Sequence, residues 1–153
     1  MFRNHGPGSG TSLDHPHSQI VAAPVVPLLI RRRFDVARQH HDDFGTCLYL
    51  EVIQREVKDG RRVVADGRRV VGFQPFAAAV PFETWVMPRF HEASFGEADD
   101  EVLDELAGVL RRVLTGLRRA LDDPPYTWSS TARRWATKGD RTSSGTSRSL
   151  ATS

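Results

Sequence analysis

The stretch Phe2–Gln19, FRNHGPGSGTSLDHPHSQ, decides how the fold of the whole chain is interpreted. Glycine recurs at every second position from Gly6 to Gly10, and a proline then separates His15 from His17. Residues two apart point to the same side of an extended backbone. Proline fixes its own φ and favours an extended conformation in the residue before it. We therefore predict two imidazoles held stiffly on one face, directly after a flexible loop.

Two kinds of chemistry suit this arrangement. Neutral imidazole is the commonest metal ligand, so the pair could bind a metal ion. A neutral imidazole can also attack phosphorus and form a covalent intermediate. The glycines let backbone N–H groups approach phosphate oxygens, with Ser12 and Gln19 as further donors. The tripeptide His-Pro-His by itself is usually an exposed loop segment without a function. The whole stretch Phe2–Gln19 is a far more specific pattern.

The stretch resembles the active-site segment of the galactose-1-phosphate uridylyltransferases, a branch of the histidine triad superfamily. The resemblance implies that His17 is the nucleophile, which takes the uridylyl group of UDP-glucose and passes it to galactose 1-phosphate. It further implies that Ser12 and Gln19 hold phosphoryl oxygens and that Asn4 lies nearby. His15 would be a zinc ligand, with its partner ligands upstream of this chain. The matching residues are Phe2, Asn4, Gly6, Ser12, His15, His17 and Gln19.

The same resemblance implies an α+β fold of histidine-triad-like half-domains, in which helices pack on an antiparallel sheet. Residues 1–28 would end the first half, residues 29–45 would form a linker helix, and residues 46–126 would form the second half. In the family, the active-site segment lies in the middle of the chain. We therefore expect a chain truncated at its N-terminus and a fold incomplete at both ends. The intact family is expected to form homodimers.

The rest of the chain predicts a short series of elements. We expect a strand over 20–26, an amphipathic helix over 28–39 and a second helix over 51–58. A hairpin is predicted over 62–73 with its turn at Asp66-Gly67, followed by a strand over 81–88. Ser94 to Glu97 has the spacing of a capping box. Apolar residues then recur at helical spacing from Val102 to Leu121, which predicts a long amphipathic helix.

A second metal site is suggested by Cys47 and His91. Members of the resembled family carry a further cysteine where Leu50 stands here, and a histidine after a Pro-Arg element such as Pro88-Arg89. Two ligands rarely hold zinc without others. We therefore expect a buried thiol and a structural histidine at these positions in place of a metal site.

Residues 127–153 are rich in Ser, Thr and Arg and lack an apolar period, which predicts a disordered tail. The resembled family continues here with a strand of the type Tyr-Asn-Leu-Val-Leu-His. Deletion of one base from codons for that strand yields Tyr-Thr-Trp-Ser-Ser-Thr, the residues 126–131 of this chain. We therefore expect a frameshift after Tyr126.

The composition of the chain indicates which partners and which cellular compartment to expect. The chain has 21 Lys or Arg and 19 Asp or Glu, but residues 127–153 hold five of the basic residues and one acidic one. The main body thus has a net charge of −2, which argues against a nucleic-acid partner. No apolar run reaches the roughly 18 residues of a membrane-spanning helix. The single cysteine is typical of a reducing cytoplasm.

Three functional interpretations remain open. The first is a uridylyltransferase that uses UDP-glucose and galactose 1-phosphate. The second is a related nucleotide phosphorylase or adenylyltransferase of the same superfamily, because the residues that would select uridine over adenine are not in this segment. The third is a fragment without activity.

Overall fold

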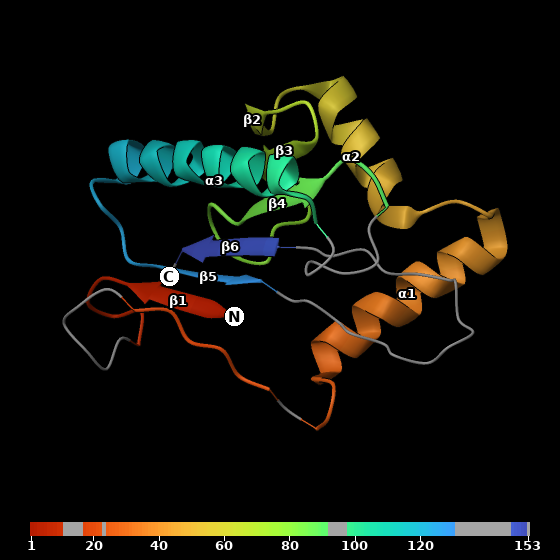
Figure 1. The fold of residues 1–153 in the computed structure, drawn as a ribbon, viewed down its shortest axis with the longest axis horizontal. Helices are drawn as coiled ribbons and strands as arrows, with labels where there is room; N and C mark the ends of the chain where they lie inside the picture. Colours follow the sequence, from red (N-terminus) through yellow and green to blue (C-terminus); the bar gives the residue numbers. More distant parts are fainter. Residues whose placement is uncertain (11–16, 23, 92–97, 131–147, 153) are drawn as a thin grey trace.

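The computed structural model describes residues 1–10, 17–22, 24–91, 98–130 and 148–152. Figure 1 shows its three helices and six strands, whose bounds are as follows. In chain order they are β1 (Phe2–His5), α1 (Leu28–Phe44), α2 (Leu48–Asp59), β2 (Val63–Asp66), β3 (Val70–Phe73), β4 (Thr84–Pro88), α3 (Asp100–Leu121), β5 (Tyr126–Ser130) and β6 (Arg148–Thr152). None of the described helices combines the length and apolarity that crossing a lipid bilayer requires.

The strands form one antiparallel sheet in the order β1-β5-β6-β4-β3-β2. This arrangement confirms the predicted α+β class with helices packed on an antiparallel sheet. Strand β5 lies between β1 and β6, so the first and last described strands of the chain are separated by a single strand. Strand β1, at the start of the Phe2–Gln19 stretch, is therefore part of the same sheet as β2, β3, β4 and β5.

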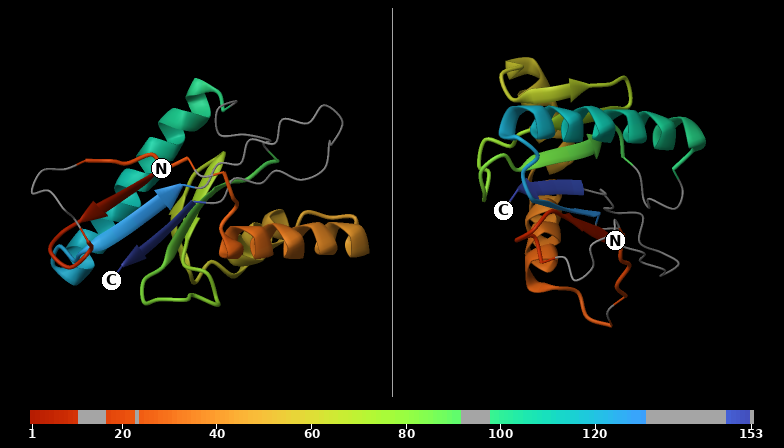
Figure 2. Two further views of the ribbon diagram at one scale, coloured as in Figure 1. Left: turned by 90° about the horizontal axis from the view of Figure 1, so that it is seen from below. Right: turned by 90° about the vertical axis from the view of Figure 1, so that its left-hand side faces the viewer.

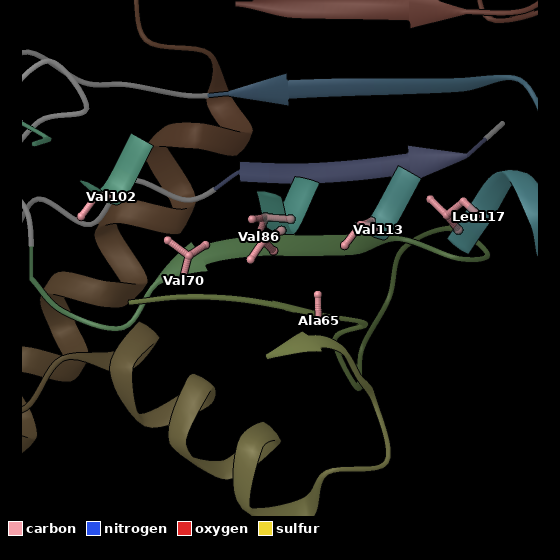
Figure 3. Close-up of a cluster of buried hydrophobic side chains, with 7 residues drawn as sticks. Ala65, Val70, Val86, Val102, Val113 and Leu117 are labelled. Carbon is pink, nitrogen blue, oxygen red and sulfur yellow. The ribbon is translucent and has the colours of Figure 1, made fainter. Parts of the chain in front are cut away.

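The long helix α3 covers one face of the sheet (Figure 2). Apolar side chains of β2, β3 and β4 point toward α3 and meet a row of apolar side chains from the helix, as Figure 3 shows. Burial of this row is expected to stabilise the fold by roughly 25 cal/mol for each Å² of apolar surface removed from water. The buried members of the cluster are Ala65, Val70, Val86, Val102, Val109, Val113 and Leu117.

The opposite face of the sheet is covered by α2. Because successive side chains of a strand point to opposite faces, Val70 packs toward α3 whereas Val71 and Phe73 pack with Ile53 of α2. The intervening Gly72 faces α3, where a Cβ atom would lie 3.0 Å from Cγ2 of Val113. A glycine at this position lets the helix approach the strand closely, and β3 is buried along its whole length.

The turn of the β2–β3 hairpin is centred two positions later than predicted. The N–H of Gly67 donates to the carbonyl of Val70 at 3.0 Å, so Arg68 and Arg69 are the central residues of the turn. The carboxylate of Glu105 on α3 accepts the backbone N–H of Arg69 through both oxygens, at 3.0 and 3.1 Å. A Cβ on Gly67 would collide with this carboxylate, which explains the glycine outside the centre of the turn.

Helix α3 begins at Asp100, and its N-cap residue is Asp99. The Asp99 carboxylate accepts the backbone N–H of Val102 at 2.8 Å and forms a two-pronged ion pair with Arg69 at 2.9 and 3.1 Å. The helix start is thus joined to the β2–β3 turn. The capping box predicted at Ser94 and Glu97 lies outside the described residues.

Three of the predictions for the N-terminal part differ from the structure. The strand predicted over 20–26 is wrong, because the described residues of this range form no strand. Helix α1 continues to Phe44 in place of residue 39 and buries none of its residues. Helix α2 begins at Leu48, three residues before the predicted start. An N-terminal stretch with little buried surface therefore precedes the packed part of the chain.

The predicted disorder of residues 127–153 is wrong for residues 127–130 and 148–152. These residues form β5 and β6, which pair with each other and join β1 to β4. The apolar period of the sequence is weak here, but the backbone hydrogen bonds of a ladder do not require apolar side chains. The sheet therefore contains two strands where the sequence predicts a disordered tail.

Candidate active site

Those predicted site residues that the structure describes, Asn4, His17 and Gln19, lie on β1 or beside its outer edge. Phe2 and Gln19 form an antiparallel bridge in which each backbone N–H donates to the other residue's carbonyl, at 2.8 and 2.9 Å. The chain therefore leaves β1 at His5, passes through the glycine loop and returns beside the start of the same strand. In this register, Asn4 and His17 each stand two residues from the bridge, on the same side of it.

His17 and Gln19 are in direct contact. The side-chain Nε2 of Gln19 lies 3.1 Å from Nε2 of His17. An amide nitrogen can only donate, so in this arrangement Nε2 of His17 accepts and carries a lone pair. His17 is half-buried, whereas Gln19 is exposed. A neutral imidazole with a lone pair beside a movable amide donor is a suitable nucleophile for an electrophilic phosphorus atom.

Asn4 lies on β1 with its side chain between β5 and the glycine loop. Its Oδ1 accepts a hydrogen bond of 3.0 Å from the hydroxyl of Thr127 on β5. Its Nδ2 lies 3.8 Å from the position that a Cβ on Gly10 would occupy. The amide donor of Asn4 is therefore close to the loop that precedes His17.

The glycine loop is anchored where it leaves β1. His5 stacks on Tyr126 with ring centroids 4.8 Å apart, and its Nε2 lies 3.4 Å from Oδ1 of Asp123. Gly6 has φ +82°, and a Cβ there would lie 3.1 Å from Cα of Pro125. Both the backbone conformation and the close approach to Pro125 favour glycine at this position.

The remaining loop contacts are local. The hydroxyl of Ser9 donates to the carbonyl of Gly6 at 2.8 Å. Gly8 and Gly10 also have positive φ, +93° and +76°. Positive φ at every second residue of the loop is a backbone conformation that glycine adopts without strain. Two of the predicted site residues, Ser12 and His15, lie outside the described residues.

The second metal site considered for Cys47 and His91 is not assembled by the described residues. Cys47 is the half-buried N-cap residue of α2, and His91 is exposed beyond the end of β4. No three His, Cys, Asp or Glu side chains come together at one point within the described ranges. Zinc sites have at least three protein ligands, so these two residues do not fit a zinc ion.

A small polar cluster joins α1 and α2, the two helices between β1 and β2. The Glu51 carboxylate contacts the hydroxyl of Thr46, and its Oε1 lies 3.2 Å from Nε2 of His40. The hydrogen bonds from Thr46 and then His40 lower the pKa of Glu51 below its ordinary value. This cluster positions α1 against α2 and lies on a different part of the chain from β1.

Three contact residues of the site were missed by sequence reasoning. They are Thr127, Tyr126 and Asp123, which contact Asn4 and His5 from a position more than 115 residues away in the chain. The signal that could have found them is the Tyr126-Thr127 pair at the start of a strand. We had assigned most of that strand to a disordered tail.

Comparison with known proteins places the chain in a family. No family model matches the chain. An ADP-glucose phosphorylase of Arabidopsis thaliana is 34% identical over 128 residues, which are 84% of this chain and 35% of that protein. A galactose-1-phosphate uridylyltransferase of Thermotoga maritima is 31% identical over 127 residues, 82% of this chain and 39% of that protein. The chain thus spans little more than a third of the length of these curated relatives.

Solved structures agree with the sequence matches. The crystal structure of an ADP-glucose phosphorylase from Arabidopsis thaliana with bound ADP-glucose has a TM-score of 0.87 and 28% identity, covering 99% of this chain and 48% of that one. A uridylyltransferase structure has a TM-score of 0.86 and 29% identity, covering 99% and 47%. A HIT family protein of Bacillus anthracis, at 14% identity and a TM-score of 0.50, shares the fold.

The order Phe-x-Asn-x-Gly, the glycine loop and His-Pro-His-x-Gln are thus found in a chain whose sequence and fold match the same group of proteins. The chain belongs to the family of galactose-1-phosphate uridylyltransferases and their homologues.

Proposed function

We propose that His17 accepts a nucleotidyl group from a nucleoside diphosphate sugar and passes it to a phosphate-containing acceptor. The observation that carries this proposal is the contact of 3.1 Å between Gln19 and Nε2 of His17, beside the strand that bears Asn4. The contact leaves a lone pair on the imidazole nitrogen. The amide donor of Gln19 lies beside this nitrogen, and we propose that it donates to an oxygen of the attacked phosphoryl group.

The proposed reaction has two steps. Nε2 of His17 attacks the α-phosphorus, a bond from nitrogen to phosphorus forms, and the bond from that phosphorus to the sugar phosphate breaks. A phosphate oxygen of the acceptor then attacks the same phosphorus, and the bond to His17 breaks. During both steps, the Gln19 amide exchanges its hydrogen bond to Nε2 for one to a phosphoryl oxygen. The Asn4 amide and the backbone N–H groups of the glycine loop stabilise the remaining oxygens.

We propose UDP-glucose and galactose 1-phosphate as the first substrate pair, with UMP as the group transferred. Support comes from the resemblance of the Phe2–Gln19 stretch and from similarity to the uridylyltransferases of several organisms, including Haemophilus influenzae at 30% identity over 115 residues. The products of the two steps would be glucose 1-phosphate and UDP-galactose.

ADP-glucose with inorganic phosphate is a second candidate pair. It is favoured by the match of 34% to a relative named ADP-glucose phosphorylase and by the related structure with bound ADP-glucose. The same imidazole would carry AMP, and attack by phosphate would release ADP. The roles proposed for Asn4, His17 and Gln19 concern the phosphate groups and leave the choice of base open, so a comparison of both sugar nucleotides is needed.

We also propose that His15 binds zinc and that the intact protein forms a homodimer. Both proposals rest on the family resemblance alone. His15 has an imidazole, a donor that zinc prefers. No step of the mechanism above uses the ion, since every transfer is made by His17, Gln19 and the loop.

The test is covalent labelling with UDP-glucose or ADP-glucose that carries ³²P at the α-phosphate. We expect label on the intact chain with one of the two probes, and its loss to background in His17→Ala. His41→Ala is the matched control, because His41 is an exposed histidine of α1 away from β1. Label that persists in His17→Ala, or no label with either probe on the intact chain, contradicts the proposal.

A further inference from the structure

The register of β1 with β5 brings one side chain of β5 against Asn4. The N–H and C=O groups of Met1 both bond to those of Ser130, so these two residues form a hydrogen-bonded pair. Such pairs alternate along an antiparallel ladder with non-hydrogen-bonded ones. Asn4 and Thr127, which are direct partners, are therefore a non-hydrogen-bonded pair. In these pairs the Cα atoms are only about 4.5 Å apart and the two side chains are closest.

The hydroxyl of Thr127 uses this proximity to contact the amide of Asn4. Its Oγ1 donates to Oδ1 of Asn4 at 3.0 Å, in a half-buried environment. With Oδ1 held by β5, the Nδ2 group is turned the other way, toward Gly10. One hydroxyl thus determines which end of the Asn4 amide faces the glycine loop.

We infer that Thr127 is a positioning residue for nucleotide binding: its hydroxyl holds the Asn4 carboxamide so that the NH₂ group faces the phosphate-binding loop. This inference rests on the proposed function, because the NH₂ group is oriented for a phosphate oxygen. In the opposite orientation, the carbonyl oxygen of Asn4 would face the loop. Two negative or partly negative oxygens would then meet, which weakens phosphate binding.

The neighbouring contacts keep the strand pair together without this hydroxyl. His5 stacks on Tyr126, and Gly6 packs against Pro125, on the residues next to the Asn4–Thr127 pair. Removal of a single hydroxyl should therefore leave β1 paired with β5. Valine has the shape of threonine and a high preference for strands, so Thr127→Val removes the hydroxyl with little other change.

The first measurement is the NMR signal of the Asn4 side-chain NH₂ group in the full chain, assigned by its absence in Asn4→Asp. In the wild type and in Thr127→Ser, we expect nuclear Overhauser effects from this NH₂ group to the Hα atoms of Gly10. In Thr127→Val, we expect these effects to weaken severalfold. Unchanged effects in Thr127→Val, or NH₂ contacts to Thr127 in place of Gly10 in the wild type, overturn the inference.

The second measurement is the affinity for UDP-glucose and ADP-glucose by calorimetry. We expect Thr127→Val to bind its preferred probe about tenfold more weakly, as the loss of one oriented hydrogen bond implies, and Thr127→Ser to stay within about twofold. Equal weakening in both variants, or none in Thr127→Val, overturns the inference. Thr127→Ala serves if the valine variant does not fold. If the wild type binds and labels with neither probe, the proposed function fails, while the NMR measurement still decides the orientation of Asn4.

Discussion

The sheet core and the N-terminal arm of this chain are built in opposite ways. The sheet core consists of α2, β2, β3, β4 and α3, and it buries side chains such as Val71, Phe73 and Val113 completely. The N-terminal arm consists of residues 17–22 and 24–44, and it exposes Ile20 by 80% and Leu29 by 72%. Apolar composition alone does not distinguish them. The difference arises because the core has a helix on each face of its sheet, whereas α1 buries none of its residues.

The two regions differ in what they contribute to folding stability and to the candidate site. The core supplies most of the buried apolar surface, while the candidate site lies on β1 and on the start of the arm. Residues of the arm can therefore be changed with little effect on folding. Residues of the core should affect the site only through the stability of the whole chain.

The largest contrast is expected between two phenylalanines. Phe73 on β3 is fully buried, so Phe73→Ala should lower the free energy of unfolding by about 3–5 kcal/mol. Phe44, at the end of α1, is 68% exposed, and Phe44→Ala should change the free energy of unfolding by less than about 0.5 kcal/mol. Urea unfolding followed by circular dichroism measures both. Similar losses in the two variants would mean that the arm is packed as tightly as the core.

Two glycines sharpen the comparison within the core. Gly72→Ala places a methyl group 3.0 Å from Val113 and should cost about 1–3 kcal/mol through overpacking. Gly116 is an exposed residue of α3 with nothing within 4 Å of an added Cβ. Gly116→Ala should instead stabilise the chain by about 0.4–1 kcal/mol, because alanine favours the helix. Thermal unfolding of the two variants should shift the midpoint in opposite directions, and a shared direction would contradict the assigned packing.

The smallest effect is expected at the start of α3. The backbone N–H of Val102, and then Arg69, lower the pKa of Asp99 below its ordinary value of 3.8. Because the folded pKa lies below the unfolded one, this carboxylate stabilises the fold above about pH 4. The contribution is lost as the pH falls through the folded pKa.

Asp99→Asn keeps an N-cap side chain but removes the titrating group. The decrease in stability between pH 5 and pH 3 should therefore be smaller in this variant than in the wild type. Urea midpoints at the two pH values measure this. Asp104→Asn, at an exposed position one turn further along α3, is the control and should follow the wild type. A decrease as large in Asp99→Asn as in the wild type would contradict the assignment of the lowered pKa to folding.

The elements of the core could be predicted because their patterns are local. The helical spacing from Val102 to Leu121 matches α3, and the β-branched runs around Gly67 match β2 and β3. The errors fell where a local pattern competes with a distant partner. Asp66-Gly67 predicted the turn, but the turn is centred two positions later, where Glu105 of α3 accepts the backbone N–H of Arg69.

The sequence indicated three residues of the candidate site but not the distant residues that contact them. His17, Gln19 and Asn4 were recognised from the Phe2–Gln19 stretch, and the structure brings the three together at β1. Thr127 could not be recognised in the same way. Its segment has few apolar residues, and the value of its hydroxyl depends on a register with β1 that spans 123 residues.

The sequence by itself determined the residue types of the site, the helices and strands of the core, and the need for glycine where the loop leaves β1. These properties depend on neighbouring residues, and local sequence carries them. Only the tertiary structure decided that β5 and β6 join the sheet, that α1 stays unburied and that Thr127 faces Asn4. Those outcomes depend on which distant backbones exchange hydrogen bonds, and every backbone carries the same donors and acceptors.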